Sequence, residues 1–334
     1  MDLFLENKAA LLIGASRGIG GATALALAAE GCRVAIVARG PAELEARADA
    51  CRRAGAPEVV PLVADASDPV QLQAAIDEAG RRLGGLDILV TLVGGSQPGG
   101  TADTDDAGWE RAFGRNLWPA VRASRAAIPW LIQGAARSVA AEAAPVREFT
   151  PVRPSPPRAV ASDPSVPSSL TVQLSALTLP GGSQQSATPV SLHAETQEVR
   201  VVPRAAVGPL LRRAGVIVHV ASIWGREGGG ALTYNAAKAA LISLAHEQAR
   251  ELAPRGVRVC SVAPGSTLHP GGSWEKRLQR DPQGTSAFVQ REIPWGRFGT
   301  AEEVADVICF LCSPRASWVS GACVVVDGSQ SRMF

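Results

Sequence analysis

The chain has 334 residues, of which 46% are hydrophobic, 19% charged and 4% aromatic, and it contains one tyrosine and three lysines. Its 33 basic and 31 acidic side chains leave a formal charge of +2, which is too small a surplus for a protein whose main partner is a nucleic acid or an anionic membrane. The apolar run near the start, residues 9–13, is too short for a membrane span or a signal segment, so we predict a soluble, cytoplasmic protein.

The chain repeats one unit, a short apolar strand followed by a turn and an amphipathic helix. The expected strands are residues 9–13, 33–37, 59–63, 86–90, 216–220, 257–262 and 322–326, and the helices between them are residues 18–30, 41–54, 69–83, 232–252 and 302–311. Strands that are apolar on both faces and alternate with helices indicate a parallel sheet covered on both sides. We predict an α/β fold, a Rossmann-like doubly wound parallel sheet of about seven strands.

A segment of different composition, residues 130–209, interrupts this alternation. It is rich in proline, serine and threonine and poor in the bulky apolar side chains that offset the entropy of ordering a chain. Joining residue 129 to residue 210 restores one helix that ends at Gly215 before the next strand. We therefore expect one catalytic domain, residues 1–129 and 210–334, with a disordered or loosely ordered insertion; alternation on either side of Gly181 leaves a small hairpin as the other interpretation.

The six cysteines lack the repeated spacing of a disulfide scaffold or a zinc site. One C-x-x-C motif, Cys309 and Cys312, lies in an apolar run, which favours buried hydrophobic side chains over redox chemistry. We expect reduced thiols and no metal.

A glycine-rich turn follows the first strand and opens the first helix. Glycines at this position allow a tight turn and a close approach of the backbone to a pyrophosphate, which the helix N-terminus favours. The strand before the turn and the helix after it predict a dinucleotide site at Gly14, Ser16, Arg17, Gly18, Ile19 and Gly20.

Arg39 stands just past the second strand, where an NAD-binding protein often has an acidic residue for the ribose hydroxyls. A guanidinium there, with Arg17 in the glycine turn, suits the additional 2′-phosphate of NADP. The residues favour NADP(H) as the cofactor, with NAD(H) as the alternative.

The only tyrosine, Tyr234, lies four residues before one of the three lysines, Lys238, in a predicted helix. This spacing puts the phenol and the ammonium on one helical face, where the positive charge stabilises a phenolate. Ser222 ends the preceding strand at the sheet edge where ligands bind in such folds.

Together these motifs resemble the classical short-chain dehydrogenase/reductase family, including its 3-oxoacyl-carrier-protein reductases. The resemblance covers nearly all of the chain outside the insertion. Besides the glycine turn, it rests on Asp65 after the third strand, Asn116, Ser222, the Tyr234-to-Lys238 motif, and Pro264 with Gly265 after the sixth strand.

The resemblance implies a role for each of these residues. Tyr234 exchanges a proton with the substrate oxygen, Ser222 hydrogen-bonds the same oxygen, Lys238 binds the nicotinamide ribose and lowers the tyrosine pKa, and Asn116 holds a water that relays protons. The other implied cofactor contacts are Asp65, Gly94, Pro264, Gly265 and Thr267. The family also implies a homodimer or homotetramer.

The chain departs from the family pattern after the fourth strand, where Thr91-Leu92-Val93-Gly94 replaces the usual Asn-Asn-Ala-Gly. This removes polar side chains that tie the central sheet together. The loops expected to select the substrate are residues 96–98, 224–227 and 266–295. Within the last, His269 is interpreted as an ordinary loop histidine, with contact to a polar substrate group as the alternative.

We expect an NADP(H)-dependent reductase of ketones, such as 3-oxoacyl thioesters, that yields secondary alcohols. One alternative is an NAD-dependent dehydrogenase of secondary alcohols or sugars. Another is a catalytically idle protein of the same fold that serves as an interaction module. The complete set of Asn116, Ser222, Tyr234 and Lys238 argues against the idle protein, because an idle site has no physical need for all four.

Overall fold

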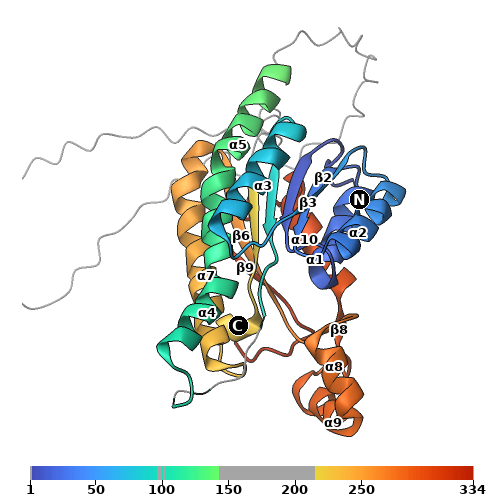
Figure 1. Cartoon of the computed structure of the whole chain (residues 1–334), viewed down its shortest axis with the longest axis vertical. Coiled ribbons are helices and arrows are strands. Elements are labelled where there is room, and N and C mark those ends of the chain that lie inside the picture. Colours follow the sequence, from blue (N-terminus) through green and yellow to red (C-terminus); the bar gives the residue numbers. More distant parts are fainter. Residues whose placement is uncertain (1, 96–99, 101, 143–214, 334) are drawn as a thin grey trace, which may run out of the picture. The chain divides into compact units, whose positions relative to one another are not determined.

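A parallel sheet of seven strands lies between two layers of helices (Figure 1). The computed structural model describes residues 2–95, 100, 102–142 and 215–333, and only the backbone of residues 135–142. The strands follow the order β3-β2-β1-β4-β5-β6-β9, and they are β1 Ala9–Ile13, β2 Arg33–Ala38, β3 Val59–Val63, β4 Ile88–Thr91, β5 Gly215–Val220, β6 Val257–Pro264 and β9 Cys323–Val326. This confirms the predicted fold class.

The strand order reverses between β1 and β4. From β1 the chain moves outward to β3, and then returns to β4 on the other side of β1. The helices that follow β1 and β4 therefore leave the sheet in opposite directions, and a crevice opens at the carboxyl ends of these two strands.

Each face of the sheet packs on its own layer of helices. Helices α1 (Gly18–Ala29), α2 (Pro41–Ala54) and α10 (Ala301–Cys312) bury apolar side chains against one face, and α3 (Pro69–Arg82), α5 (Trp118–Glu142) and α7 (Leu232–Leu252) cover the other. Successive residues of a strand point to opposite faces, so Leu11 joins the second core and its neighbour Leu12 the first. Both faces are therefore apolar, as the strand composition predicts.

The remaining described elements are short. Helix α4 (Asp106–Asn116) precedes α5. After β6 come a two-stranded sheet of β7 (Thr267–Leu268) and β8 (Gly299–Thr300), and helices α8 (Ser273–Arg280) and α9 (Pro282–Glu292), which lie at the lower end of the molecule in Figure 1. Single 3-10 turns are η1 Ile223–Gly225, η2 Ala253–Arg255 and η3 Pro314–Ala316. In the described residues no helix is both long and apolar enough to span a membrane.

Helix α5 contains Pro129 and continues to Glu142, past the expected start of the insertion at residue 130. Leu131 is fully buried in the core, and the indole Nε1 of Trp130 donates to Asp77 Oδ1 of α3 at 3.2 Å. Full burial of Leu131, about 1.5 to 3 kcal/mol, and partial burial of Trp130 offset the roughly 3 kcal/mol that a proline costs inside a helix. The rest of the expected insertion, residues 143–209, lies outside the described residues.

The chain divides into two units, Met1–Ala144 with Arg204–Phe334, and Pro145–Pro203. All strands of the sheet and all candidate site residues belong to the first unit. The hairpin considered around Gly181 falls in the second, outside the described residues.

Candidate functional site

The glycine turn joins β1 to α1 at the crevice. Gly14 and Gly18 adopt positive φ angles of 91° and 56°, which favour glycine. A Cβ atom on Gly20 would collide with the carbonyl oxygen of Gly14, so only glycine lets the helix start this close to the strand. No side chain of the described chain caps the first turn of α1 and no acidic residue lies in it. The turn therefore offers backbone N–H groups and a helix dipole to an anion.

Arg39 and Asp65 follow β2 and β3, next to each other in the sheet. The Asp65 carboxylate accepts hydrogen bonds from the backbone N–H and the hydroxyl of Ser67, which lower its pKa, and the charge of Arg39 lowers it further. Both residues are at least partly exposed at the edge where the adenosine end of a dinucleotide lies in this fold.

Ser222 and Tyr234 are brought together by the packing of η1 on α7. A Cβ atom on Gly225 of η1 would lie 2.6 Å from the backbone carbon of Lys238, so glycine permits this contact. Ser222 caps η1 by accepting a hydrogen bond from Trp224 N at 3.2 Å, and its side chain is hydrogen-bonded to Tyr234. Burial raises the pKa of the Tyr234 phenol, and the bond with Ser222 acts in the opposite direction.

Lys238 is 3% exposed and lies one turn after Tyr234, with its Nζ 5.7 Å from the centroid of the tyrosine ring. Its ammonium donates to the carbonyl oxygen of Val220 at 2.9 Å. Burial lowers the pKa of Lys238 to about 8. The free protein thus holds a protonated phenol beside an ammonium that loses its proton more readily than usual.

Asn116 ends α4 and joins the group through Gly94. A Cβ atom on Gly94 would lie 2.8 Å from Asn116 Oδ1 and 3.0 Å from Lys238 Nζ, so glycine allows both side chains to approach this loop. Asn116 Oδ1 accepts from Gly95 N at 2.9 Å, while Nδ2 donates to the carbonyl oxygens of Gly95 and Ala112 at 3.1 and 2.9 Å. Both amide hydrogens are in use, which leaves one lone pair of Oδ1 for a water.

The segment after β6 is held by the C-terminal residues. The buried amide of Gln330 accepts from Ser266 N at 2.7 Å and donates to Ser266 Oγ at 3.0 Å, and Gly265 N donates to Val326 O at 2.9 Å. Thr267 Oγ1 donates to Gly265 O at 3.2 Å. Sequence reasoning found Pro264, Gly265 and Thr267 but missed Gln330, since no motif marks a glutamine near the end of the chain.

The expected substrate loops differ in what they contact. Residues 96–98 lie outside the described residues. The Trp224 ring occupies the space beside Gly229 and Gly230, where a Cβ atom would meet it. A Cβ atom on Gly18 would lie 2.8 Å from Cε1 of His269, so this histidine packs on the glycine turn. His269 therefore packs on the glycine turn, and the alternative of a contact with substrate stays a prediction.

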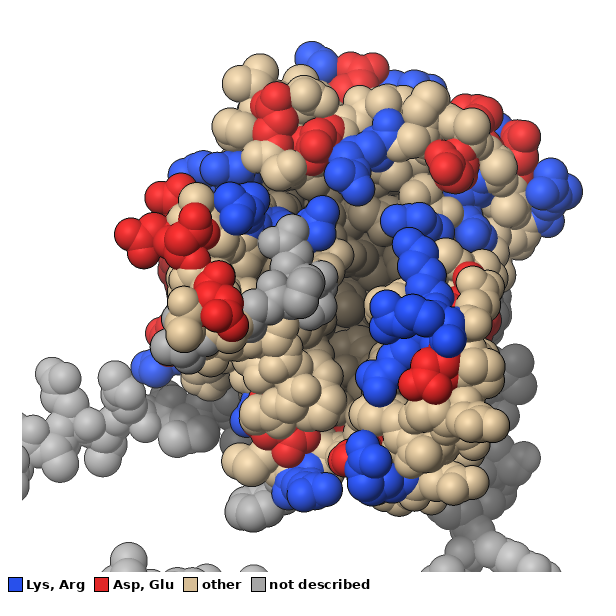
Figure 2. All heavy atoms as spheres, turned by 60° about the horizontal axis from the view of Figure 1, so that its bottom comes forward, with Lys and Arg blue, Asp and Glu red and all other residues tan. Residues whose placement is uncertain are grey.

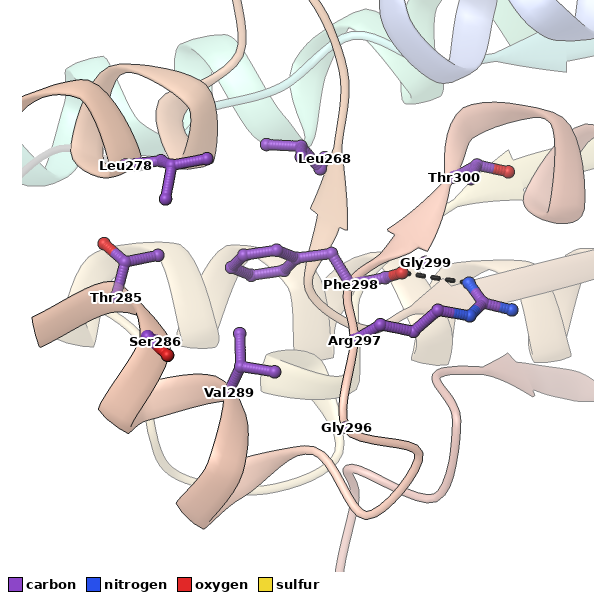
Figure 3. Close-up of a pocket in the computed structure, with 10 residues that line it drawn as sticks. All are labelled: Leu268, Leu278, Thr285, Ser286, Val289, Gly296, Arg297, Phe298, Gly299 and Thr300. Atoms are coloured by element: carbon purple, nitrogen blue, oxygen red, sulfur yellow. Dashed lines mark hydrogen bonds between the residues drawn. The ribbon is translucent and has the colours of Figure 1, made fainter. Parts of the chain in front are cut away.

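A cavity of about 380 Å³ lies between the two short strands and helices α8 and α9 (Figure 3). Leu268, Leu278, Val289 and Phe298 line it, and the phenyl ring of Phe298 points between the two helices. None of Asn116, Ser222, Tyr234 and Lys238 is among its lining residues. The cavity is thus separate from these four side chains.

A buried polar network replaces the family's polar residues after β4. Thr91 Oγ1 lies 2.7 Å from His219 Nδ1, and His219 Nε2 lies 2.9 Å from Gln248 Oε1 of α7. Burial lowers the pKa of His219 to about 4, so the ring is neutral at pH 7. Because Oε1 can only accept, Nε2 carries the proton and Thr91 donates to Nδ1. These hydrogen bonds join β4, β5 and α7. The central sheet therefore keeps polar cross-links although Thr91 replaces the usual asparagine of the family.

All six cysteines are free, and burial raises the pKa values of Cys309 and Cys312. This confirms the expectation of inert, buried thiols in the C-x-x-C motif. In the described part of the chain, no group of three histidine, cysteine or acidic side chains is placed to hold a metal ion.

The chain is similar to known oxidoreductases in both halves. Residues 8–141 match the family model described as short chain dehydrogenase, and residues 199–329 match the one described as enoyl-(acyl carrier protein) reductase. The 2-(S)-hydroxypropyl-CoM dehydrogenase 3 of Xanthobacter autotrophicus is 27% identical over 98% of both chains. The 3-oxoacyl-[acyl-carrier-protein] reductase FabG of Thermotoga maritima is 26% identical over 97% of this chain and 98% of its own.

Among solved structures, L-sorbose reductase from Gluconobacter frateurii, complexed with NADPH and L-sorbose, superposes with a TM-score of 0.72 at 23% identity and full coverage of both chains. At this identity the similarity shows the fold. With the two family models and the full-length relatives, the chain belongs to the short-chain dehydrogenase/reductase family of oxidoreductases.

Proposed function

We propose that the protein is an NADP(H)-dependent oxidoreductase that reduces a ketone, such as a 3-oxoacyl thioester, to a secondary alcohol. The observation that carries the proposal is the convergence of Ser222, Tyr234, Lys238 and Asn116 beside the glycine turn at one sheet edge. The similarity to a 3-oxoacyl-[acyl-carrier-protein] reductase supports the substrate class. The L-sorbose reductase of the same fold is complexed with NADPH, which supports the cofactor.

The residues of the site fit the cofactor. The uncapped first turn of α1 and the glycines before it suit the pyrophosphate, Arg17 and Arg39 suit the 2′-phosphate, and the ammonium of Lys238 suits the nicotinamide ribose. When bound, the reduced nicotinamide supplies the hydride. Gly94, with the turn of Pro264 and Gly265, leaves space for close approach of the ring.

The protein supplies the proton and orients the carbonyl. Tyr234 Oη donates a hydrogen bond to the carbonyl oxygen of the substrate, and Ser222 Oγ donates a second, so the charge that develops on this oxygen is stabilised. Tyr234 then transfers its proton to the oxygen, and the ammonium of Lys238 stabilises the phenolate that remains. Lys238 then gives up a proton that restores the Tyr234 phenol, and a water on Asn116 Oδ1 returns a proton from solvent to Lys238.

The raised pKa of Tyr234 means that the free enzyme holds the proton that ketone reduction requires. The phenol keeps its proton at neutral pH, and reduction needs the protonated form whereas alcohol oxidation needs the phenolate. The similarity to 2-(S)-hydroxypropyl-CoM dehydrogenase keeps oxidation of a secondary alcohol as a second candidate. For either candidate, reduction should fall and oxidation should rise as the pH passes the tyrosine pKa, because the two directions need opposite forms of the phenol.

The test is absorbance at 340 nm with NADPH and with NADH across a panel of 3-oxoacyl thioesters, sugar ketones and simple ketones. In Tyr234→Phe, turnover should fall by about 10² to 10⁴ while the affinity for NADPH changes by less than about threefold. Ser222→Ala should lose turnover in the same way. Undiminished turnover of Tyr234→Phe contradicts the mechanism, and equal or better use of NADH contradicts the cofactor preference.

We propose a homodimer or homotetramer, tested by light scattering after size exclusion, where a monomer mass would contradict it. Six free cysteines suit a reducing compartment such as the cytoplasm.

A further inference from the structure

Three arginines lie in or near the segments that meet at the glycine turn. Arg17 lies in the turn, Arg39 follows β2, and Arg47 lies in α2. Figure 2 shows that Lys and Arg side chains gather beside a hollow on the face that carries the carboxyl ends of the strands. The sequence singles out Arg17 and Arg39, whereas nothing in its motifs points to Arg47.

Arg47 reaches from α2 back to the turn. Its Nε donates to the carbonyl oxygen of Ser16 at 3.3 Å. A Cβ atom on Gly21 of α1 would lie 2.9 Å from both Cζ and Nη2 of Arg47, so the guanidinium lies directly on the backbone of α1 at Gly21. Glycine at position 21 is therefore what leaves room for this side chain.

The charge of Arg47 is not neutralised. Among the residues that the structure describes, none of Arg17, Arg39 and Arg47 forms an ion pair. On the same helix, by contrast, Arg52 pairs with Glu45 and Asp49. A guanidinium has five N–H donors, and Arg47 uses one of them on the protein. Since the side chain is half-buried, its other donors are left for water or for an acceptor that a ligand brings.

The position of Arg47 indicates what this acceptor is. In this fold the adenosine ribose lies between the glycine turn and the end of the second strand. Arg47 lies in α2, which begins at Pro41 just after Arg39, and its side chain contacts the carbonyl oxygen of Ser16 in the glycine turn. We propose that Arg47 is a specificity-determining residue that binds the 2′-phosphate of NADP(H) together with Arg17 and Arg39, in the place that Gly21 leaves open.

This inference rests on the proposed use of NADP(H), and its test is a binding measurement with no turnover. NADPH and NADH differ only in the 2′-phosphate, so their dissociation constants are measured for the full chain by isothermal titration calorimetry. Arg47→Ala should weaken NADPH binding about tenfold or more, the size expected for loss of a charge-assisted, bidentate contact, and should change NADH binding by less than about twofold.

Arg53→Ala is the matched control. Arg53 lies on the same helix, is exposed and forms no ion pair with a described residue, so its loss changes the net charge by the same amount. Both dissociation constants should stay within about twofold of the wild type, because a distant exposed charge is screened.

Two further variants keep the test decisive if Arg47→Ala fails to fold. Arg47→Lys retains the positive charge but loses the paired N–H donors of the guanidinium, and its affinity for NADPH should fall several-fold. Gly21→Ala leaves the arginine in place but displaces its guanidinium, and should also weaken NADPH more than NADH. These two variants together would then decide the question.

Failure of the role of Arg47 can be distinguished from failure of the proposed use of NADP(H). A wild-type protein that binds NADH as tightly as NADPH overturns the cofactor proposal and this inference with it. A wild type that prefers NADPH, with an Arg47→Ala variant that keeps the same preference, overturns only the role of Arg47. Equal weakening of both cofactors in Arg47→Ala also overturns it, since the arginine would then only support the turn.

Discussion

At the scale of single residues, the site keeps a buried ammonium at a cost in stability. Lys238 is 3% exposed and among the described residues no carboxylate pairs with it. Its pKa falls from 10.5 to about 8 on folding, so the unfolded chain binds more protons between these values. The folded state is therefore disfavoured below pH 8 by on the order of 3 kcal/mol, and this cost disappears as the pH rises towards 10.5.

Lys238→Met should therefore stabilise the protein in the absence of cofactor. At pH 7 we expect the free energy of unfolding to rise by about 1 to 3 kcal/mol, less what the lost hydrogen bond to Val220 contributes, and the gain should shrink towards pH 10. Urea unfolding at several pH values measures it, with the exposed Lys276→Met as control. A destabilised variant at pH 7 would contradict the interpretation.

At the scale of elements, His219 joins β4, β5 and α7 through one neutral ring. Its pKa is 6.5 in the unfolded chain and about 4 in the fold, so the unfolded state binds more protons in this window. Stability contributed by His219 is complete above pH 6.5 and is lost as the pH falls to 4, by on the order of 3 kcal/mol.

The free energy of unfolding should fall less between pH 7 and pH 4 in His219→Gln than in the wild type. His246→Gln, at an exposed position, should leave the wild-type slope unchanged; an equal slope in His219→Gln would refute the role.

The end of α10 depends on one buried arginine of β6. Arg258 donates to the carbonyl oxygens of Val319, Leu311 and Ser313 at 3.0, 2.8 and 3.1 Å. Without Arg258, the buried carbonyl groups at the C-terminus of α10 lose their hydrogen-bond donors.

Arg258→Met should lower the free energy of unfolding by roughly 3 kcal/mol in urea titrations, while the exposed Arg255→Met should change it by less than about 0.5 kcal/mol. Similar small changes in both variants would show that water replaces the guanidinium.

The elements also show what a sequence can predict. Helix α7 has the predicted bounds because its apolar period is a local property of the sequence. The length of α5 could not be predicted from Pro129, since the residues that keep the helix going, Trp130 and Leu131, act through contacts with distant parts of the core. The glycine turn, Tyr234 and Lys238 were found from spacing alone. Arg47 and Gln330 were not, because a long side chain reaches its partner across another element.

At the scale of the whole molecule, the catalytic unit contains the complete sheet and every candidate site residue. We predict that replacing residues 145–203 by a short Gly-Ser linker preserves NADPH affinity within about threefold. Calorimetric titration of the shortened and full-length proteins measures this. A shortened protein that folds but no longer binds would show that the removed segment contributes to the site.

The chain has one tyrosine, and the fold places it on Ser222 and Lys238. Biosynthetic replacement of tyrosine by 3-fluorotyrosine therefore labels one atom per chain, and it labels the proposed proton donor. A fluorine NMR spectrum of the intact protein would contain one resonance. Its position against pH, with and without cofactor, would report the ionisation of Tyr234 with no assignment step.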